Sequence, residues 1–399
     1  MDEMVRKINE EAIALKPQLV EWRRDFHRHP ERSFAEHRTA GIVADALEKM
    51  NITVQRGVGG TGVVGFLPGK LAGPTIALRA DMDAIAVTEL SDKEYVSVNK
   101  GVMHGCGHDG HTASLLGAAM LLSRHRDELK CNVKFIFQPA EEAVPGGATP
   151  MVKDGCLDGV EAIFGGHFNS PLTVGQTKCH EGLSLASITL FEIEITGKGV
   201  HCSYPHLGID TIMVAAHLLI NLQTLVSRQM DPLLPKALSV CQIHGGEHFA
   251  ATPQTVVLRG AFLVVTNEQR SFMEQEMENK VRTTCEMFGA QYRIQYQHGS
   301  PALVNDRKMA AYARSIITDL LGPDSLKEIP PTLGWEDFAE YLQKVPGALY
   351  FVGACNPTKD IIYPHHHPKF DLDEDALVIM TSIHSLIALQ YPGRSKSME

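Results

Sequence analysis

The segment from Met103 to His111, M-H-G-C-G-H-D-G-H, places one thiol, one carboxylate and three imidazoles within nine residues. Side chains so polar and so crowded are costly to bury unless they bind something, and the glycines between them let the backbone approach a small ion. Cysteine and histidine together suit zinc, nickel, cobalt or manganese. The alternative is a structural cysteine among surface histidines. The density of ligand-type side chains favours a metal site, so we expect the fold to bring other ligand side chains close to this segment.

Strand and helix patterns alternate through the first part of the chain. Helices are predicted at 3–28, at 39–50 and in the apolar run after His111, and strands at 52–55, 62–67, 75–79, 132–138 and 162–166. This alternation favours a mostly parallel sheet with helices on both faces. Cys106 and His108 then fall between a buried strand and a buried helix, at the sheet edge where open α/β proteins bind ligands.

The middle of the chain follows another pattern. From 187 to 298 the order is β-α-β-β-α-β, which is the ferredoxin-like arrangement, and helix–strand–helix character returns after Pro301. We therefore predict an α/β fold in which one discontinuous domain, 1–186 with 299–399, contains an inserted α+β domain, 187–298.

Three further groups carry metal-binding or acid–base side chains. Glu141 and Glu142 end the segment F-Q-P-A-E-E; adjacent carboxylates are usually solvated, but in a split pair one binds metal while the other moves a proton. His167 ends G-G-H after another strand, and 365–367 is a histidine triplet; either could be plain surface. Together these groups hold enough ligands for two ions, as in two-metal hydrolases: Cys106, His108, Glu142, His167 and one histidine of 365–367.

Composition excludes several other roles. The net charge is −10, from 37 basic and 47 acidic residues without a basic block, so we expect no nucleic-acid partner. No apolar run reaches transmembrane length, and the amphipathic start does not resemble a signal peptide, so we expect no membrane association. Eight cysteines without disulfide-like spacing predict a reducing cytoplasm. The residues after Pro392 are predicted to be disordered.

The chain resembles the M20 metallopeptidases, and among them the aminoacylase-like amidohydrolases: hippurate hydrolases, auxin–amino acid conjugate hydrolases and N-acyl-amino acid amidohydrolases. The matching segments run in family order over nearly the whole chain: R-R-D-F-H-R-H-P-E (23–31), E-H-R-T (36–39), R-A-D-M-D-A (79–84), M-H-G-C-G-H-D-G-H-T-A (103–113), F-Q-P-A-E-E (137–142), G-G-A (146–148), G-K-G-V-H with P-H (197–206), G-W-E-D-F (334–338) and H-H-H-P-K-F-D (365–371). The resemblance implies a discontinuous zinc-peptidase-like catalytic domain with an inserted ferredoxin-like lid or dimerisation domain.

The resemblance also implies roles for individual residues. The family's ligands to two divalent ions (Zn, Mn, Ni or Co) fall on Cys106, His108, Glu142, His167 and His366. Glu141 falls on the general base, which takes a proton from a metal-activated water and delivers it to the departing amine. Asp83 falls on a carboxylate that orients a ligand. His201 falls on a histidine that reaches across a homodimer or higher homo-oligomer to the oxyanion; nothing in the spacing alone selects Asp83 or His201.

Two departures from the family bear on the substrate, which is expected to be a small amide such as an N-acyl amino acid. Ala250 stands where the family usually has asparagine, and Leu263 where it usually has an arginine that pairs with a substrate carboxylate. Leucine cannot supply a bidentate donor, so a free α-carboxylate loses its expected partner. An amide with a neutral, apolar or aromatic amine side fits equally well. Arg259 lies about 13 Å along the same strand face, which makes direct replacement doubtful.

Other functions share some of these residues. A dipeptidase or aminopeptidase would use the same metals but needs a group for the free amine. A thiol hydrolase would use Cys106 as the nucleophile with His108 or His111, and would survive chelators. A non-catalytic metal-binding relative would have no need of an acid–base carboxylate at Glu141. The glycines of G-V-G-G-T-G at 57–62 are not followed by a helix, which argues against dinucleotide binding.

Overall fold

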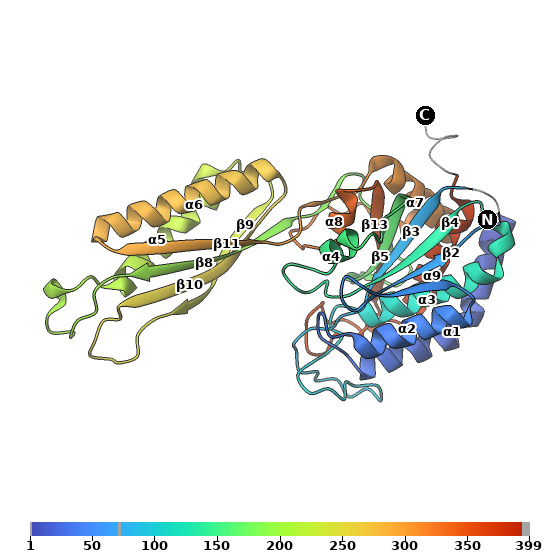
Figure 1. Cartoon of the computed structure of the whole chain (residues 1–399), viewed down its shortest axis with the longest axis horizontal. Coiled ribbons are helices and arrows are strands. Elements are labelled where there is room, and N and C mark those ends of the chain that lie inside the picture. The colour runs from blue at the N-terminus through green and yellow to red at the C-terminus, as the bar shows by residue number, and fades with distance from the viewer. Residues whose placement is uncertain (1, 71–72, 393–399) are drawn as a thin grey trace. The chain divides into compact units, whose positions relative to one another are not determined.

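The computed structural model describes residues 2–70 and 73–392, drawn in Figure 1. Contacts within the chain divide it into two compact units. Unit 1 comprises Met1–Ser184, Val304–Pro331 and Asp337–Glu399, and unit 2 comprises Leu185–Leu303 and Thr332–Glu336. The predicted disordered tail lies outside the described residues. Among the described helices, none is both long enough and apolar enough to cross a membrane.

A mixed seven-stranded sheet forms the centre of unit 1, in the order β1-β2-β4-β3-β5-β13-β6. Figure 1 labels its strands β2, β3, β4, β5 and β13. Its strands are β1 (Thr53–Val58), β2 (Gly62–Leu67), β3 (Thr75–Asp81), β4 (Asn132–Gln138), β5 (Val160–Thr173), β6 (Thr177–Lys178) and β13 (Gly347–Cys355). The central strands β4, β3, β5 and β13 are parallel, whereas β1, β2 and β6 pair antiparallel with their neighbours. The predicted parallel arrangement therefore holds only at the centre, because a turn as short as that between β1 and β2 permits only antiparallel pairing.

Helices cover both faces of this sheet. They are α1 (Glu3–Arg28), α2 (His37–Lys49), α3 (His108–Arg124), α4 (Ala148–Lys153), α7 (Arg307–Leu321), α8 (Phe338–Leu342) and α9 (Asp375–Gln390). The long helices α1, α3, α7 and α9 share one continuous apolar core with the sheet. The short helix α8 packs on the other face, where a Cβ on Gly165 would lie 2.9 Å from the Phe338 ring. The apolar runs of α3 and α9 are buried on all sides, as expected for helices inside a layer.

Unit 2 has its own sheet, in the order β11-β8-β10-β9, with every pair antiparallel. Its elements are β8 (Ser187–Thr196), α5 (Thr211–Thr224), β9 (Lys236–His244), β10 (Thr255–Val264), α6 (Asn267–Phe288) and β11 (Gln291–His298). This is the predicted ferredoxin-like order, and α5 and α6 lie along one face of the sheet (Figure 1). Alternate residues of β8, such as Phe191 and Ile193, point into a separate apolar core. The remaining short elements are β7 (Leu183–Leu185), β12 (Leu303–Val304) and single helical turns.

Several predicted elements have the observed limits. Helix α1 and strands β2 and β4 begin and end where the hydrophobic periodicity places them. Helix α3 differs, because it begins at His108 and not after His111. Gly107, with φ of 92°, caps this helix in the left-handed region that favours glycine, so part of the histidine-rich segment becomes the first turn.

Candidate metal centre

The carboxyl ends of parallel strands β3, β4 and β5 meet at one edge of the unit 1 sheet. The loop after β3 leads to Cys106 and His108, and the loop after β4 carries Glu141 and Glu142. His167 lies within β5 itself. Because strands that run parallel end at the same edge, this topology gathers side chains that are far apart in sequence.

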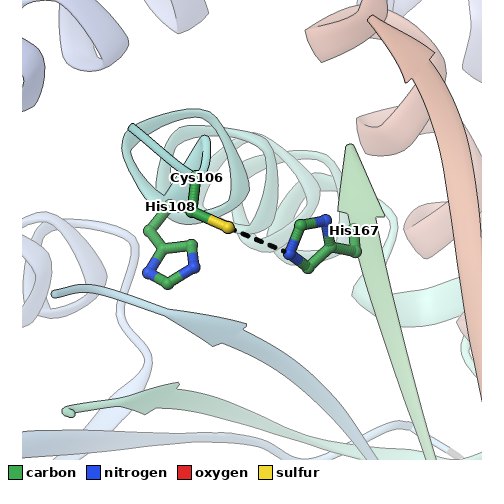
Figure 2. A group of neighbouring side chains, drawn as sticks. All are labelled: Cys106, His108 and His167. Carbon is green, nitrogen blue, oxygen red and sulfur yellow. Dashed lines mark hydrogen bonds between the residues drawn. The ribbon is translucent and has the colours of Figure 1, made fainter. Parts of the chain in front are cut away.

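One group of possible ligands joins Cys106, His108 and His167, whose nearest ligand atoms all lie within 4.8 Å of one another. Figure 2 shows the thiol of Cys106 facing the His167 ring, with Sγ 3.6 Å from Nε2. His108 and His167 lie edge to face, with ring centroids 6.1 Å apart. A Cβ on Gly110 would lie 2.6 Å from the Phe168 ring, so glycine is needed where α3 approaches β5.

A second group joins Cys106, Glu142 and His366 within the same limit of 4.8 Å. His366 Nε2 lies 3.0 Å from Glu142 Oε1. The backbone of His366 has φ of 65°, an uncommon conformation for a residue other than glycine, and its N–H donates to the Gly105 carbonyl at 2.8 Å. Cys106 belongs to both groups, so its sulfur lies between the two clusters.

His366 is distinguished from its neighbours in the histidine triplet by its contacts. His365 Nε2 accepts a hydrogen bond from the Ser170 N–H at 3.2 Å. His367 Nδ1 accepts one from the Lys369 N–H at 3.0 Å. These two imidazoles are therefore engaged with backbone, and His366 is the one placed against the Glu142 carboxylate.

Asp83 connects the two carboxylates to His108. Its Oδ1 accepts from the Glu141 N–H and its Oδ2 from the Glu142 N–H, both at 3.0 Å. His108 Nδ1 lies 2.9 Å from the Asp83 carbonyl and 3.2 Å from Oδ1. The opposite ring nitrogen, His108 Nε2, is thereby directed into the cluster, as for metal-binding histidines held by a carboxylate.

Glu141 sits at the end of a tightly held turn. Ala140 before it has φ of 56°, and its N–H donates to Glu36 Oε1 at 2.8 Å. The Glu141 Oε2 atom lies 3.8 Å from His108 Nε2, close to the cluster. Strained backbone in a non-glycine residue persists only where the surroundings hold it, and here the Glu36 carboxylate holds the turn that precedes Glu141.

Asp81 and His111 are buried beside His108, and the sequence analysis did not place either of them among the metal ligands. His111 Nδ1 lies 2.6 Å from Asp81 Oδ1, and Arg79 Nη1 donates to Asp81 Oδ2 at 2.8 Å. Burial by itself raises the pKa of Asp81, but the charges of His108, Arg79 and His111 hold it well below its usual range. The only signal in the sequence is local: Asp81 precedes Asp83 in R-A-D-M-D-A, and His111 ends the histidine-rich segment.

The donor set suits cations. His108 Nε2 is buried with no hydrogen-bond partner, although carboxylates of Asp81, Glu141 and Glu142 lie within 4.0 Å of it. Burial and the neighbouring charges of Glu142 and Glu141 raise the pKa of the Cys106 thiol. A nitrogen without a partner and acidic groups crowded around a thiol are what a divalent ion would satisfy.

His201 lies in unit 2, unlike the other predicted site residues, which unit 1 gathers. It is exposed, and its Nδ1 accepts a hydrogen bond from the Ser203 N–H at 3.2 Å. The turn of His201 pairs with that of Ala250, whose carbonyl accepts from the Cys202 N–H at 2.8 Å. Leu263 is half-buried in β10.

Comparison with known proteins supports the resemblance drawn from the motifs. The profile of peptidase family M20/M25/M40 matches residues 77–390. N-acetyl-L-cysteine deacetylase of Bacillus subtilis is 37% identical over 366 residues, which cover 91% of this chain and 86% of that protein. Thermostable carboxypeptidase 2 of Saccharolobus solfataricus is 36% identical over 395 residues, covering 98% of this chain and 100% of that protein. The solved structure of a dinuclear metal-binding M20 peptidase from Bacillus subtilis has a TM-score of 0.80 and 33% identity, covering 94% of this chain and 98% of that one.

These matches extend over most of the chain, including the segments that carry the clustered side chains. The predicted α/β fold and the predicted class of enzyme are both confirmed: the protein is a metal-dependent hydrolase that acts on the carbon–nitrogen bonds of small amides. The chain belongs to peptidase family M20/M25/M40.

Proposed function

We propose that unit 1 holds two divalent cations, Zn, Mn, Ni or Co, with Cys106 shared between them. His108 and His167 would complete one site, and Glu142 and His366 the other. The observation that carries this proposal is that five side chains from four separate segments of the sequence come together in two groups that have Cys106 in common. Mixed thiolate, imidazole and carboxylate ligands favour these metals over Mg or Ca. The dinuclear centre of the Bacillus subtilis M20 peptidase supports the count of two.

The proposed reaction is hydrolysis of an amide by water. Bound divalent ions would lower the pKa of a coordinated water and polarise the carbonyl of the substrate. Glu141 joins His108 and Glu142 in a further group of possible ligands, but neither group of Cys106 includes it. It takes the proton of the attacking water and delivers it to the departing amine. Asp83 acts as a positioning residue, because it holds the backbone of both glutamates and the ring of His108.

We further propose that residues 187–298 act as a lid and dimerisation domain, in which His201 stabilises the oxyanion of the partner subunit's reaction. Exposed apolar side chains on α5 support an interface: Ile220 is 74% exposed and Met213 is 49% exposed. Sedimentation should give at least a dimer. A fully active monomer would exclude a shared site.

The proposed substrates are N-acyl amino acids or related small amides. The similarity to the N-acetyl-L-cysteine deacetylase supports an N-acyl amino acid as the substrate. The similarity to the carboxypeptidase supports a dipeptide-like substrate as the alternative. Because Leu263 cannot pair with a carboxylate as arginine would, amides with a neutral or aromatic amine side are included. We expect no nucleic-acid partner. All eight cysteines are free thiols, which supports a cytoplasmic location.

A comparison of inhibitors tests the metal mechanism against a Cys106 thiol mechanism. Phenanthroline or EDTA should abolish hydrolysis of N-acetyl and N-benzoyl amino acids, and added Zn, Mn, Co or Ni should restore it. Activity that survives chelation but is lost to iodoacetamide would instead assign Cys106 as a nucleophile.

A glutamate variant tests the base. Glu141→Gln should retain the full metal content and lose at least about a hundredfold in kcat, because the amide cannot accept the water proton. Glu142→Gln is the matched control and should lower metal content as well as turnover. Unchanged turnover in Glu141→Gln would exclude it as the base.

A further inference from the structure

Lys178 is a buried cation that the proposed chemistry does not use. It ends the edge strand β6, and the residue is only 4% exposed. Within the described part of the chain, its Nζ makes no hydrogen bond and no ion pair. Burial alone lowers the pKa of this amine. Lysine is almost never fully buried without a partner, so an uncompensated ammonium at this place needs a reason.

The lysine belongs to a row of side chains that leads to the metal centre. In the sheet register, Lys178 of β6 pairs with Phe351 of β13, and Phe351 pairs with His167 of β5. Nζ lies 4.3 Å from the centroid of the Phe351 ring, whose centroid is 5.9 Å from that of the His167 ring. Paired residues project from the same face, so the row ends at a proposed metal ligand about two strand spacings, each about 4.8 Å, away.

The face that carries this row is the one on which α8 packs. Leu349 and Phe351 alternate with core residues along β13, and a Cβ on Gly165 would lie 2.8 Å from the Leu349 side chain. Thr177, before the lysine, points to the opposite face, where its hydroxyl donates to the Ser325 carbonyl at 3.3 Å. The direction of the Lys178 side chain is therefore set by strand alternation as well as by its ring contact.

The ammonium retains capacity for a ligand. Its attraction to the Phe351 ring is electrostatic and leaves its three N–H donors able to hydrogen bond. Nζ is not among the described polar atoms that are both unpartnered and closed off from solvent, so it retains some exposure to solvent. A carboxylate is the complement of such a charge, because a charge-assisted hydrogen bond in a desolvated site is strong.

We propose that Lys178 is a specificity residue that binds a carboxylate of the amide substrate while the scissile carbonyl lies at the metal centre. This inference rests on the proposed function. It assigns to unit 1 an anion contact that Leu263 cannot provide in unit 2. The carboxylate can belong to the acyl side or to the amine side of the amide, and the two sources are separated by the substrates chosen.

The test uses two pairs of amides that share a phenethyl amine side and differ in one carboxylate. N-succinylphenethylamine is compared with N-butyrylphenethylamine for the acyl side, and N-acetylphenylalanine with N-acetylphenethylamine for the amine side. Released amine is measured with the metal-loaded, full-length wild type and with Lys178→Met, which keeps the length and packing of the side chain but removes the charge. Metal content and Tm are recorded for each protein.

We expect Lys178→Met to lower kcat/KM for one anionic substrate by roughly ten- to a hundredfold, as for loss of a charged hydrogen bond. The neutral partner should change by less than about threefold, and the pair affected identifies the source of the carboxylate. Lys178→Arg should retain more of the preference than Lys178→Met. Lys49→Met, at an exposed lysine ending α2, is the matched control and should change neither pair.

Equal losses for both members of each pair, or no loss, would overturn the inference and leave Lys178 a structural residue. If Lys178→Met does not fold, kcat/KM of the wild type is compared within each pair. The inference is overturned if the wild type does not prefer either anionic amide over its neutral partner. A wild type that hydrolyses the neutral amides without such a preference keeps the proposed function. A wild type inactive on all four, with metals bound, rejects both.

Discussion

At the scale of single residues, Asp83 connects several parts of the centre. It accepts hydrogen bonds from the Glu141 and Glu142 backbones and from the Ser33 hydroxyl, and it holds the ring of His108. Burial by itself raises the pKa of Asp83, but these contacts, led by that with His108, lower it, so the acceptor stays ionised. One carboxylate thus aligns a proposed base with two proposed ligands.

Replacement of Asp83 by asparagine should therefore weaken metal binding. Both carboxylate oxygens face backbone donors, and the Asn amide would set an NH2 group against one of them. We expect metal affinity to fall by about ten- to a hundredfold, measured by titration calorimetry with Zn or Mn. Asp45→Asn, on the exposed side of α2, is the control and should bind as the wild type does. Wild-type affinity in Asp83→Asn would remove its positioning role.

At the scale of elements, the segment between β4 and α4 is clamped from within unit 1. Asp337 Oδ2 accepts from the Ala148 N–H at 3.0 Å and from Gln138 Nε2 at 2.8 Å. Arg79 donates to both Gln138 and Asp337. A Cβ on Gly146 would lie 2.1 Å from Asp337 Oδ2, so only glycine lets this segment close over the carboxylate.

Gly146→Ala should accordingly destabilise the protein by about 1–3 kcal/mol, as overpacking does, and should lower kcat because the same segment carries Glu141. Urea unfolding and steady-state kinetics measure the two effects. Gly41→Ala, in α2 with open space around the added methyl, should instead stabilise by up to about 1 kcal/mol. Equal stabilities for the two variants would contradict the clamp.

Helix α9 buries a titratable ring that makes the core sensitive to acid. His384 Nδ1 lies 3.0 Å from the Tyr350 hydroxyl, and its other nitrogen is buried without a partner. Burial, with a smaller contribution from His111, lowers the pKa of His384 to about 3. The unfolded chain takes up this proton near pH 6.5, so the folded state loses stability as the pH falls below that value.

His384→Gln should reduce this acid sensitivity. The glutamine carbonyl can accept the Tyr350 hydrogen bond but does not titrate between pH 7 and 5. The wild type should lose about 2 kcal/mol more than the variant between these values, a difference measured by urea unfolding at each pH. Parallel losses in the two proteins would show that His384 is not the group responsible.

At the scale of the whole molecule, the two units have separate apolar cores, while all proposed metal ligands belong to unit 1. Helix α6 of unit 2 is capped at both ends by residues of the same unit: Thr266 and Gln269 form a capping box at its start, and Gly289 ends it. The stability of one unit is thus expected to depend on metal and that of the other to be independent of it.

Calorimetry with and without metal tests this division. Ligand at 100 to 1,000 times its Kd stabilises the folded state by about 3–4 kcal/mol, so Zn or Mn should raise the transition of unit 1. The transition of unit 2 should stay in place, and His108→Ala should remove the shift. A single transition that moves as a whole with metal would contradict independent units.

Much of the fold could be predicted because its signals are local. The periodicity of α1 and of the apolar strands β2 and β4 is a property of short windows, and the observed limits of these elements agree with the predicted ones. The β-α-β-β-α-β order of unit 2 also agrees with the prediction. The cluster of ligand-type residues at 103–111 was visible for the same reason. The antiparallel flanks of the large sheet were missed, because strand direction depends on which distant strands become neighbours.

The sequence by itself determined which chemical groups are present and which strands deliver them to one edge of the sheet. The family resemblance had placed His366 among the ligands, but only the tertiary structure shows which groups meet: His366 against Glu142, His111 on Asp81, and the row from Lys178 to His167. These pairings join residues separated by up to 224 positions along the chain. Such contacts depend on register and on side-chain direction in the packed fold, and no local pattern encodes either.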